Sequence, residues 1–254
     1  MIFSLLKKLI KIFIPQSLIK FKDKIIIKFN RKKFTQLNLE TKEIFNKIYS
    51  EKLWTPDNQK NFFKYYSGSG SHEFEFVEEY ISKISRYLSS FCSKPSVIDL
   101  GCGDFNVGSK LRQYCSTYIA TDIVEGLIDY NIHKYKDLEV DFITLDIINE
   151  RIPKAEICFL RLVLQHLSNK DIGNFLDLNK DNFNKLIITE HYPRSKSFIP
   201  NIDKPTGPDI RLYDDSAVVL TMPPFNLRVK KEIDLCEVFS SKIKGSIKTK
   251  LLIL

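Results

Sequence analysis

The stretch at residues 96–111, SVIDLGCGDFNVGSKL, is the part of the sequence that most clearly indicates the fold. Residues 97–100 are a short, mostly apolar run of the length expected for a buried strand. The run ends in two glycines, Gly101 and Gly103, which allow a tight turn and a close approach of the backbone to a ligand. A glycine-rich turn between a strand and a helix commonly holds a nucleotide, so this turn predicts a site for a nucleotide-like ligand.

The turn does not match the common phosphate-binding sequences. A dinucleotide fingerprint would need a third glycine where the chain has Asn106, and the residues around Gly108 do not supply the lysine and hydroxyl of a P-loop. Asp99, two residues before the first glycine, places a carboxylate that would repel phosphate but could approach an ammonium group. The pattern therefore favours a cationic ligand without phosphate.

Runs with strand character alternate with helical patterns along the rest of the chain. Strands are expected at residues 96–100, 117–122, 139–145, 155–161, 185–190, 230–238 and 246–253, and helices at 39–53, 74–91, 106–115, 124–136 and 168–182. Ser168 and Asp171 form a capping pair that opens the last helix. This order predicts an α/β, Rossmann-like fold, with a mostly parallel seven-stranded sheet and helices on both faces. Ligands of such sheets bind at the carboxyl ends of the strands.

The composition excludes several classes of protein. The chain has 254 residues, of which 43% are hydrophobic and 28% charged, as is typical of a soluble globular protein. Its five cysteines are odd in number and include no CxxC pair. This argues against a disulfide framework and a zinc site, and predicts a cytoplasmic protein without a bound metal.

The basic residues are concentrated in residues 1–36, a predicted helical extension of the domain at 37–254. The extension holds ten lysines and arginines and a single acid, Asp23, so the rest of the chain is close to neutral and predicts no nucleic-acid partner. Residues 1–14 would place apolar side chains on one helical face and lysines on the other. Such a helix lies peripherally on the inner face of the membrane or packs on protein, and the sequence leaves both open.

The motif VIDLGCGDFNVG resembles the first motif of the class I S-adenosylmethionine-dependent methyltransferases, and the resemblance extends over residues 67–254. In that family the turn wraps the methionine end of S-adenosylmethionine, which implies that Gly101, Gly103 and nearby Asp99 bind the cofactor. An acid that ends the second strand binds both ribose hydroxyls, and Asp122 occupies that place, 19 residues past Gly103. A carboxylate suits this role because it accepts hydrogen bonds from two O–H donors.

The third and fourth strands supply the remaining family positions. Asp146 follows the third strand, where the resemblance implies a contact with the adenine amino group. Ile123 and Ile147 are expected to be apolar neighbours of the adenine ring, and Arg161 ends the fourth strand beside the cofactor. The resemblance thus implies cofactor-binding roles for Asp99, Gly101, Gly103, Asp122, Ile123, Asp146, Ile147 and Arg161.

Two histidines follow the fourth and fifth strands, where an acceptor should meet the methyl group. A histidine can take a proton near neutral pH, so it can activate an acceptor hydroxyl. We favour His166 as the base, with His191 as the alternative. Both histidines could instead only brace the site, and an acceptor that is already anionic would need no base.

Residues 192–225 hold six of the ten prolines and show no helical period, which predicts a substrate-covering loop. Substrate-binding groups are expected at Tyr192 and Arg211 of this segment, and at His72 in the SGSGSH turn at 67–72. The sequence MPPF at 222–225 is expected to be a turn, because base-methylating enzymes carry an Asn/Asp-Pro-Pro-aromatic tetrad directly after the fourth strand instead.

These features together predict a cytoplasmic S-adenosylmethionine-dependent methyltransferase that acts on a small-molecule, sugar or phosphate-type acceptor, by O-methylation. Trp54 together with the sequence SGSGS also resembles bacterial methyltransferases of surface-polysaccharide and capsule gene clusters, which implies a glycan-linked substrate. Two alternatives stay open at this point. The chain could methylate the nitrogen of a small amine, or it could be a non-catalytic cofactor-binding partner of another methyltransferase.

Overall fold

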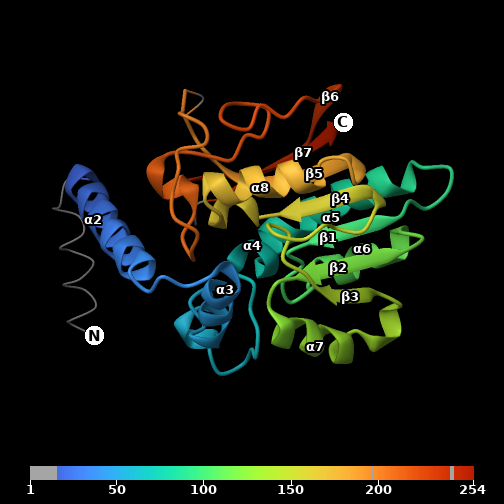
Figure 1. Cartoon of the computed structure of the whole chain (residues 1–254), viewed down its shortest axis with the longest axis horizontal. Helices are drawn as coiled ribbons and strands as arrows, with labels where there is room; N and C mark the ends of the chain where they lie inside the picture. The colour runs from blue at the N-terminus through green and yellow to red at the C-terminus, as the bar shows by residue number, and fades with distance from the viewer. Residues whose placement is uncertain (1–15, 196, 241–242) are drawn as a thin grey trace. The chain divides into compact units, whose positions relative to one another are not determined.

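The computed structural model describes residues 16–195, 197–240 and 243–254 (Figure 1). The chain divides into two compact units between Asn38 and Leu39. The first unit contains the described helix α2 (Gln16–Thr35), on which Ile25, Ile26 and Phe29 are exposed. The amphipathic helix predicted for residues 1–14 lies outside the described residues. No helix in the described part of the chain is long and apolar enough to cross a membrane.

The second unit is built on one seven-stranded sheet with the spatial order β3-β2-β1-β4-β5-β7-β6. The strands are β1 (Val97–Leu100), β2 (Tyr118–Asp122), β3 (Asp141–Thr144), β4 (Ala155–Arg161), β5 (Phe183–Pro193), β6 (Lys231–Phe239) and β7 (Gly245–Ile253). The first five strands are parallel, and β7 pairs antiparallel with both β5 and β6. The predicted Rossmann-like fold is confirmed, because the strand order reverses beside β1, between β1 and β4.

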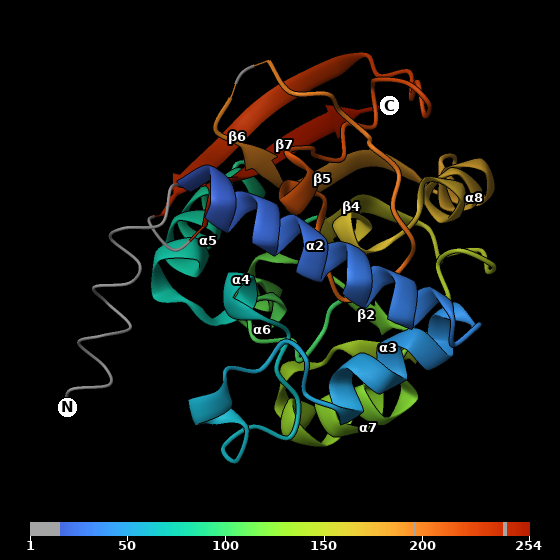
Figure 2. The same cartoon turned by 90° about the vertical axis from the view of Figure 1, so that its left-hand side faces the viewer.

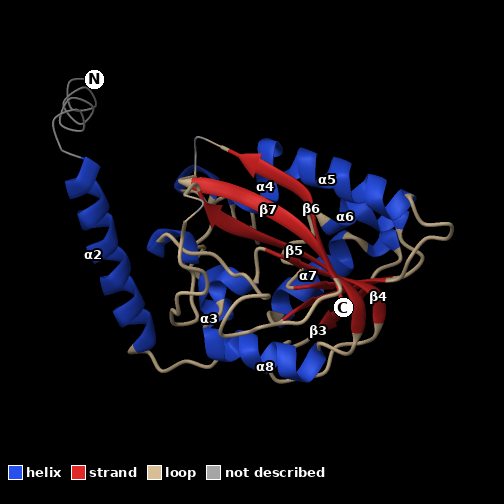
Figure 3. Cartoon of the chain, turned by 90° about the horizontal axis from the view of Figure 1, so that it is seen from above, coloured by secondary structure: helices blue, strands red, loops and turns tan. Residues whose placement is uncertain are grey.

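Alternate residues of the central strands supply two separate hydrophobic cores, because successive side chains of a strand point to opposite faces. On one face Ile98, Cys158 and Leu186 pack with α8 (Asn169–Asn179). On the other face Val97, Ile157 and Ile187 pack with α5 (Phe74–Ser89). Figure 3 shows α5 and α8 on opposite sides of the strands. Helices therefore cover both faces of the sheet, as predicted.

Two further helices, α3 (Thr41–Ser50) and α7 (Glu125–Lys134), agree with the sequence patterns. The short helix α4 (Ser69–His72) falls in the segment 67–72 that was expected to be a turn. The capping pair of α8 is confirmed, because the Ser168 side chain accepts a hydrogen bond from the Asp171 amide.

The helix predicted for residues 106–115 is wrong in its extent. It is shortened to α6 (Gly108–Leu111), followed by the 3-10 turn η2 (Arg112–Tyr114). Residues 106–107 form a turn instead. Phe105, just before the predicted start, has a φ of 59°, a left-handed conformation that an α-helix cannot contain, so no helix extends back through the glycine turn.

The connection between β5 and β6, residues 194–230, contains no α-helix among its described residues, only the 3-10 turn η5 (Arg211–Asp214). Side chains buried within the protein order this connection. Asn201 donates to the Val219 and Pro223 carbonyls, and its own side-chain oxygen accepts from the Val219 amide. The residues 222–225 form a turn, as predicted. The β5–β6 connection is thus an ordered segment that packs on the sheet end.

Candidate functional site

A cavity of about 440 Å³ lies at the carboxyl ends of the parallel strands. Its wall is formed by the glycine turn, the ends of β1, β2, β4 and β5, and the segments that carry α3 and α4. Those two helices lie on the side of the molecule that faces the viewer in Figure 2. The ten predicted cofactor-binding and catalytic residues all line this one cavity: Asp99, Gly101, Gly103, Asp122, Ile123, Asp146, Ile147, Arg161, His166 and His191.

The glycine turn needs its glycines, but for a reason the sequence did not predict. Gly101 and Gly103 have φ angles of 66° and 58°, in the left-handed region. A Cβ atom on Gly103 would lie 2.3 Å from the Ser67 hydroxyl, and one on Gly101 would lie 2.7 Å from Val163. Neighbouring side chains of the protein, rather than a ligand, therefore fill the space beside both glycines.

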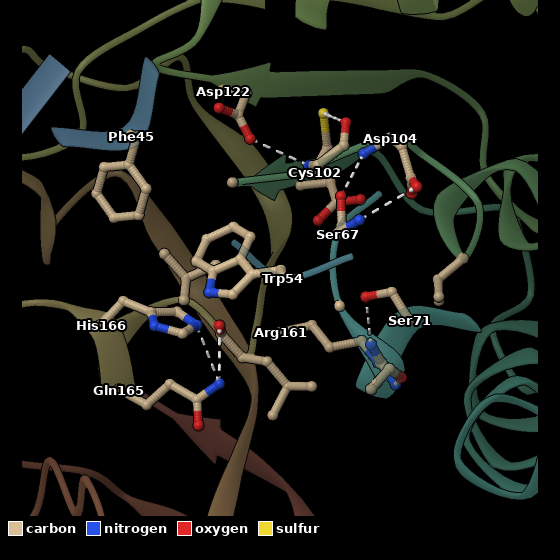
Figure 4. A pocket seen from close by; sticks show the side chains of 18 of the residues that line it. Phe45, Trp54, Ser67, Ser71, Cys102, Asp104, Asp122, Arg161, Gln165 and His166 are labelled. Carbon is tan, nitrogen blue, oxygen red and sulfur yellow. Dashed lines mark hydrogen bonds between the residues drawn. The ribbon is translucent and has the colours of Figure 1, made fainter. Parts of the chain in front are cut away.

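Ser67 and Asp104 lock the glycine turn to the segment that precedes α4. The Ser67 hydroxyl accepts a hydrogen bond from the Asp104 amide at 2.7 Å, and the Ser67 amide donates to the Asp104 carboxylate at 3.3 Å (Figure 4). His72, predicted to contact the substrate, lies outside the cavity lining. Its ring pairs with the Asp104 carboxylate at 2.5 Å and stacks on Tyr66. Through its bond to Asp104, His72 stabilises the glycine turn that lines the cavity.

Two buried carboxyl groups face the cavity from the ends of β1 and β2. Asp122 accepts hydrogen bonds from the Gly103 and Val124 amides, each at 3.1 Å, so its position is fixed by the turn it serves. Asp99 accepts from the Tyr118 hydroxyl at 2.9 Å. Burial raises the pKa of each carboxyl group to about 6, because a charged carboxylate loses hydration in the interior. Both groups are poised to gain stabilisation from a ligand that donates hydrogen bonds or carries positive charge.

Asp146 lines the same cavity, together with two apolar residues. Its carboxylate accepts from the Ile148 amide at 2.9 Å and from the Asn149 side chain at 2.8 Å, so it also orders the turn after β3. Ile123 and Ile147 line the cavity beside it. A carboxylate next to apolar walls matches a flat heteroaromatic ring that carries an amino group.

Arg161 at the end of β4 is a buried cation beside the cavity. Its guanidinium donates to the Gly70 carbonyl at 2.6 Å and to the Ser71 hydroxyl at 3.2 Å, and it lies over the Tyr80 ring. Its Nε atom is buried without a hydrogen-bond partner. Burial lowers its pKa, as expected for a cation removed from water. The guanidinium connects α4 to the sheet and brings positive charge to this part of the cavity.

His166 lies at the opposite end of the cavity from Asp122, beside Gln165 (Figure 4), and His191 lines the same cavity. His166 belongs to the 3-10 turn η4 (Leu164–His166), and His191 lies on β5. Burial lowers the pKa of His166 to about 3, with the nearby charges of Lys204 and His191 contributing. Burial and then the charge of Arg161 lower the pKa of His191 to about 4. Both rings are therefore neutral at physiological pH.

The other two residues predicted to contact the substrate also lie outside the cavity lining. The Tyr192 hydroxyl donates to the Val218 carbonyl at 3.4 Å. Arg211 is 1% exposed, and its guanidinium donates to the Leu164 carbonyl at 2.9 Å and to the Asn169 side chain at 2.8 Å. Arg211 thus holds the turn that carries His166.

An aromatic wall beside the histidines was not recognised as such in the sequence. Trp54 lies with its ring 4.8 Å from that of His166 and 5.4 Å from that of Tyr49, and Phe45 lies on its other side. The Trp54 indole donates to the Pro208 carbonyl at 3.0 Å, which ties the segment after α3 to the β5–β6 connection. Phe45, Tyr49 and Trp54 lie within ten residues of one another, on α3 and the turn after it, but their position beside His166 depends on the fold and no sequence motif identifies it. Within the described residues, no group of His, Cys, Asp or Glu is arranged to hold a metal ion.

The fold matches those of solved methyltransferases. The N-methyltransferase NodS from Bradyrhizobium japonicum WM9, in complex with S-adenosyl-L-homocysteine, aligns with a TM-score of 0.55 and 12% identity. The alignment covers 80% of this chain and 95% of NodS. The magnesium protoporphyrin IX methyltransferase ChlM from Synechocystis PCC 6803, with bound S-adenosylmethionine, aligns with a TM-score of 0.50 and 16% identity over 85% of this chain and 98% of ChlM. The chain therefore has the Rossmann-like methyltransferase fold.

Comparison at the level of sequence identifies no relatives. No family model matches the chain, and no curated protein matches it either. The fold is thus established by the structural matches, while the chemistry of the site has to be argued from this chain's own residues.

Proposed function

We propose that this protein is an S-adenosylmethionine-dependent methyltransferase that transfers a methyl group to an oxygen of a small-molecule, sugar or phosphate-type acceptor. The observation that carries the proposal is the single cavity shared by two groups of residues. The glycine turn, Asp99 and Asp122 line one end, and His166 and His191 line the other. A cofactor and an acceptor held at the two ends would share one enclosed space.

The residues at the first end fit the chemistry of the cofactor. The Asp122 carboxylate has lone pairs beyond those used by the Gly103 and Val124 amides, which suits two ribose hydroxyls. Asp146 with Ile123 and Ile147 would receive the adenine, and the Asp99 carboxyl group would face the positively charged methionine end. The cavity volume of about 440 Å³ lies within the roughly 300–1,000 Å³ of common ligand pockets. The Arg161 guanidinium, which lines the cavity, would bring positive charge toward the cofactor carboxylate.

When bound, S-adenosylmethionine supplies a methyl group attached to a positively charged sulfur. The protein's contribution is to orient an acceptor oxygen toward that group, to exclude water and to take the acceptor proton. The Trp54 ring packs against His166 and covers the acceptor end, and a neutral histidine there has a ring nitrogen able to accept a proton. Alignment inside an enclosed cavity is expected to provide most of the rate acceleration.

The biological setting remains a proposal drawn from the sequence. The resemblance of Trp54 and SGSGS to methyltransferases of surface-polysaccharide and capsule gene clusters supports a glycan-linked acceptor. The basic extension at residues 1–36 supports a cytoplasmic enzyme in peripheral contact with the inner face of the membrane. Salt-sensitive binding of the full chain to vesicles that contain anionic lipid would test that contact.

Calorimetric titration with S-adenosylmethionine, followed by transfer of an isotopically labelled methyl group, tests the proposed function. The acceptor panel should contain monosaccharides, sugar phosphates, nucleotide sugars and small amines. Binding of the cofactor and label on an oxygen acceptor are expected, and the Asp122→Ala variant serves as the control that should lose both.

Two outcomes would overturn the proposal in different ways. Label found only on amines would assign N-methylation instead. Cofactor binding without turnover on any member of the panel would favour the non-catalytic partner.

A further inference from the structure

Gln165 connects the two histidines of the cavity by direct hydrogen bonds. Its side-chain oxygen lies 2.6 Å from His191 Nδ1, and its side-chain nitrogen lies 3.3 Å from His166 Nε2. The same nitrogen donates to the Leu162 carbonyl at 3.2 Å. Gln165 is only 4% exposed, so these contacts do not compete with bulk water.

The Leu162 carbonyl fixes which way the Gln165 amide points. A backbone carbonyl can only accept hydrogen bonds, so the amide atom that faces it must be the NH₂ group. The amide oxygen therefore faces His191. This assignment comes from the backbone and does not depend on the protonation of either histidine.

The amide orientation in turn fixes the tautomer of both rings. The amide oxygen accepts only, so His191 must carry its proton on Nδ1 and leave Nε2 without one. The amide NH₂ donates only, so His166 Nε2 must be the unprotonated nitrogen, and its proton is on Nδ1. The lone pair of His166 Nε2 is then occupied by the Gln165 amide.

The two rings consequently differ in what they can offer to an acceptor. Within the described part of the chain, the hydrogen bond of the His191 ring is the one made by Nδ1, and the ring lines the cavity. His166 Nδ1 carries a proton and is enclosed without a partner. His191 thus presents an available lone pair, whereas His166 has no free lone pair on either nitrogen.

We propose that Gln165 is a positioning residue that assigns the base role to His191, leaving His166 as a support. This inference rests on the proposed function. During transfer, the acceptor oxygen forms its bond to the methyl carbon while the carbon–sulfur bond breaks with its electron pair remaining on sulfur. The acceptor's O–H proton passes to His191 Nε2. The Nδ1–H bond to the Gln165 oxygen orients the resulting imidazolium, which later releases its proton to water.

The turn that carries Gln165 is held from both ends, as a positioning role requires. Buried Glu190 accepts a hydrogen bond from the Leu164 amide at 3.0 Å. At the other end, the His166 carbonyl accepts from the Gly207 amide at 2.9 Å and from the buried Lys204 ammonium at 3.2 Å. Because η4 is only three residues long, these external bonds rather than its own helical bonds hold it in place.

The tautomers can be measured without cofactor or acceptor, by long-range proton–nitrogen NMR of the ¹⁵N-labelled full chain at pH 7.5. His166 and His191 should both show protonated Nδ1 and unprotonated Nε2. Signals are assigned with single His→Gln variants. His133, whose Nδ1 lies 2.9 Å from the Asp129 carbonyl, provides a ring outside the cavity for reference. A proton on Nε2 of His191 in the wild-type protein would overturn the proposal.

Two substitutions separate positioning from packing. Gln165→Glu retains an acceptor toward His191 but replaces the donor toward His166, so His166 should move its proton to Nε2 while His191 stays unchanged. Gln165→Leu removes both bonds, and His191 should lose its fixed tautomer. If both rings keep the wild-type pattern in the two folded variants, Gln165 only fills space and the inference is wrong.

The kinetic arm distinguishes this inference from the proposed function. His191→Gln should lose at least tenfold more turnover than His166→Gln, with cofactor affinity measured separately and unchanged in both. Equal losses, or a greater loss in His166→Gln, would contradict the assignment of the base. Absence of methyl transfer by the wild-type chain would instead contradict the proposed function, and the NMR result would still decide the tautomers.

Discussion

The two ends of the cavity are built in different ways. At the end proposed for the cofactor, the glycine turn and Asp122 lie within 22 residues of each other in the sequence, and the Asp122 carboxylate accepts a hydrogen bond from the Gly103 amide directly. At the end proposed for the acceptor, Trp54, His166 and His191 come from segments far apart, and the β5–β6 connection bonds to the first two. One end is a local motif, whereas the other is a product of tertiary packing.

The role of the β5–β6 connection in the structure differs from the one predicted from the sequence. The sequence predicted a cover that supplies polar groups to the substrate. In the structure its buried cations point to backbone carbonyls instead, Lys204 to that of His166 and Arg211 to that of Leu164. Among its residues, Pro208, Ile210 and Tyr213 reach the cavity wall. The connection therefore serves mainly to hold the histidine turn, and it contributes part of the wall.

The largest expected effect is at the cofactor end, in Gly103→Ala. The new Cβ would lie 2.3 Å from the Ser67 hydroxyl in a left-handed backbone conformation. Strain of about 1–2 kcal/mol from the backbone and about 1–3 kcal/mol from overpacking should lower the stability of the fold. Movement of the turn away from Ser67 relieves this strain but misplaces the turn, so cofactor affinity measured by calorimetry should fall roughly a hundredfold.

The matched control for that substitution is Gly173→Ala. Gly173 lies within α8, and a Cβ there meets no atom within 4 Å. This variant should keep its cofactor affinity and gain about 0.5–1 kcal/mol of stability, as alanine does in a helix interior. Equal affinities for both variants would show that the glycine turn does not shape the cofactor end.

Asp122→Ala should reduce cofactor affinity at least tenfold. The substitution removes an acceptor for two ribose hydroxyls, and hydrogen bonds to a charged group contribute about 1.5–3 kcal/mol each. The far-ultraviolet circular dichroism spectrum is expected to stay the same, because Asp122 ends its strand. Calorimetry that finds wild-type affinity in the folded variant would place the ribose acid elsewhere.

The pH dependence of stability should have opposite signs at the two ends. The pKa values of His166 and His191 are lowered to about 3 and about 4. As pH falls through about 6.5, these histidines therefore become protonated in the unfolded chain but stay neutral in the folded chain. Each histidine then costs about 2 kcal/mol of stability at pH 5. Asp122 has a pKa raised to about 6, so the folded chain binds its proton first, and stability rises by about 1 kcal/mol over the same fall.

Denaturant titrations at pH 7.5 and pH 5 of three proteins test these signs. Relative to wild type, His166→Gln should lose less stability on acidification, whereas Asp122→Asn should lose more. If the free energy of unfolding changed equally with pH in both variants, burial would not act in opposite directions on the histidines and on Asp122.

The smallest effects come from single hydrogen bonds on the two sides of Tyr49. Trp54→Phe removes the bond to the Pro208 carbonyl, and Tyr49→Phe removes the 3.1 Å bond to the Ser67 hydroxyl. Each should cost about 0.5–1.5 kcal/mol of stability in thermal unfolding. The first should raise the KM for the acceptor and leave cofactor affinity intact, and the second should do the reverse. If both variants changed the acceptor KM and the cofactor affinity in the same way, the two ends of the cavity would not act independently.

The sequence determined the sheet because its signals are local. The apolar run before Gly101, the alternating strands and helices, and the acids that end β2 and follow β3 each depend on residues near one another. The fold, and the residues that bring the strand ends to the cavity, could therefore be predicted. The same reasoning overestimated the helix after the glycine turn, where residues 106–107 form a turn and residues 112–114 form a 3-10 turn. It also assigned His72, Tyr192 and Arg211 to the substrate, although these lie outside the cavity lining.

Only the tertiary structure decided which side chains are free to act. The sequence favoured His166 over His191 from position alone, but the availability of each ring nitrogen depends on Gln165 and on the Leu162 carbonyl that orients it. It likewise could not show that Lys204 and Arg211 are used to hold η4. Strand and turn preferences arise from neighbours along the chain. Hydrogen-bond partners, burial and the resulting pKa values arise from neighbours in space, which the folded sheet brings together.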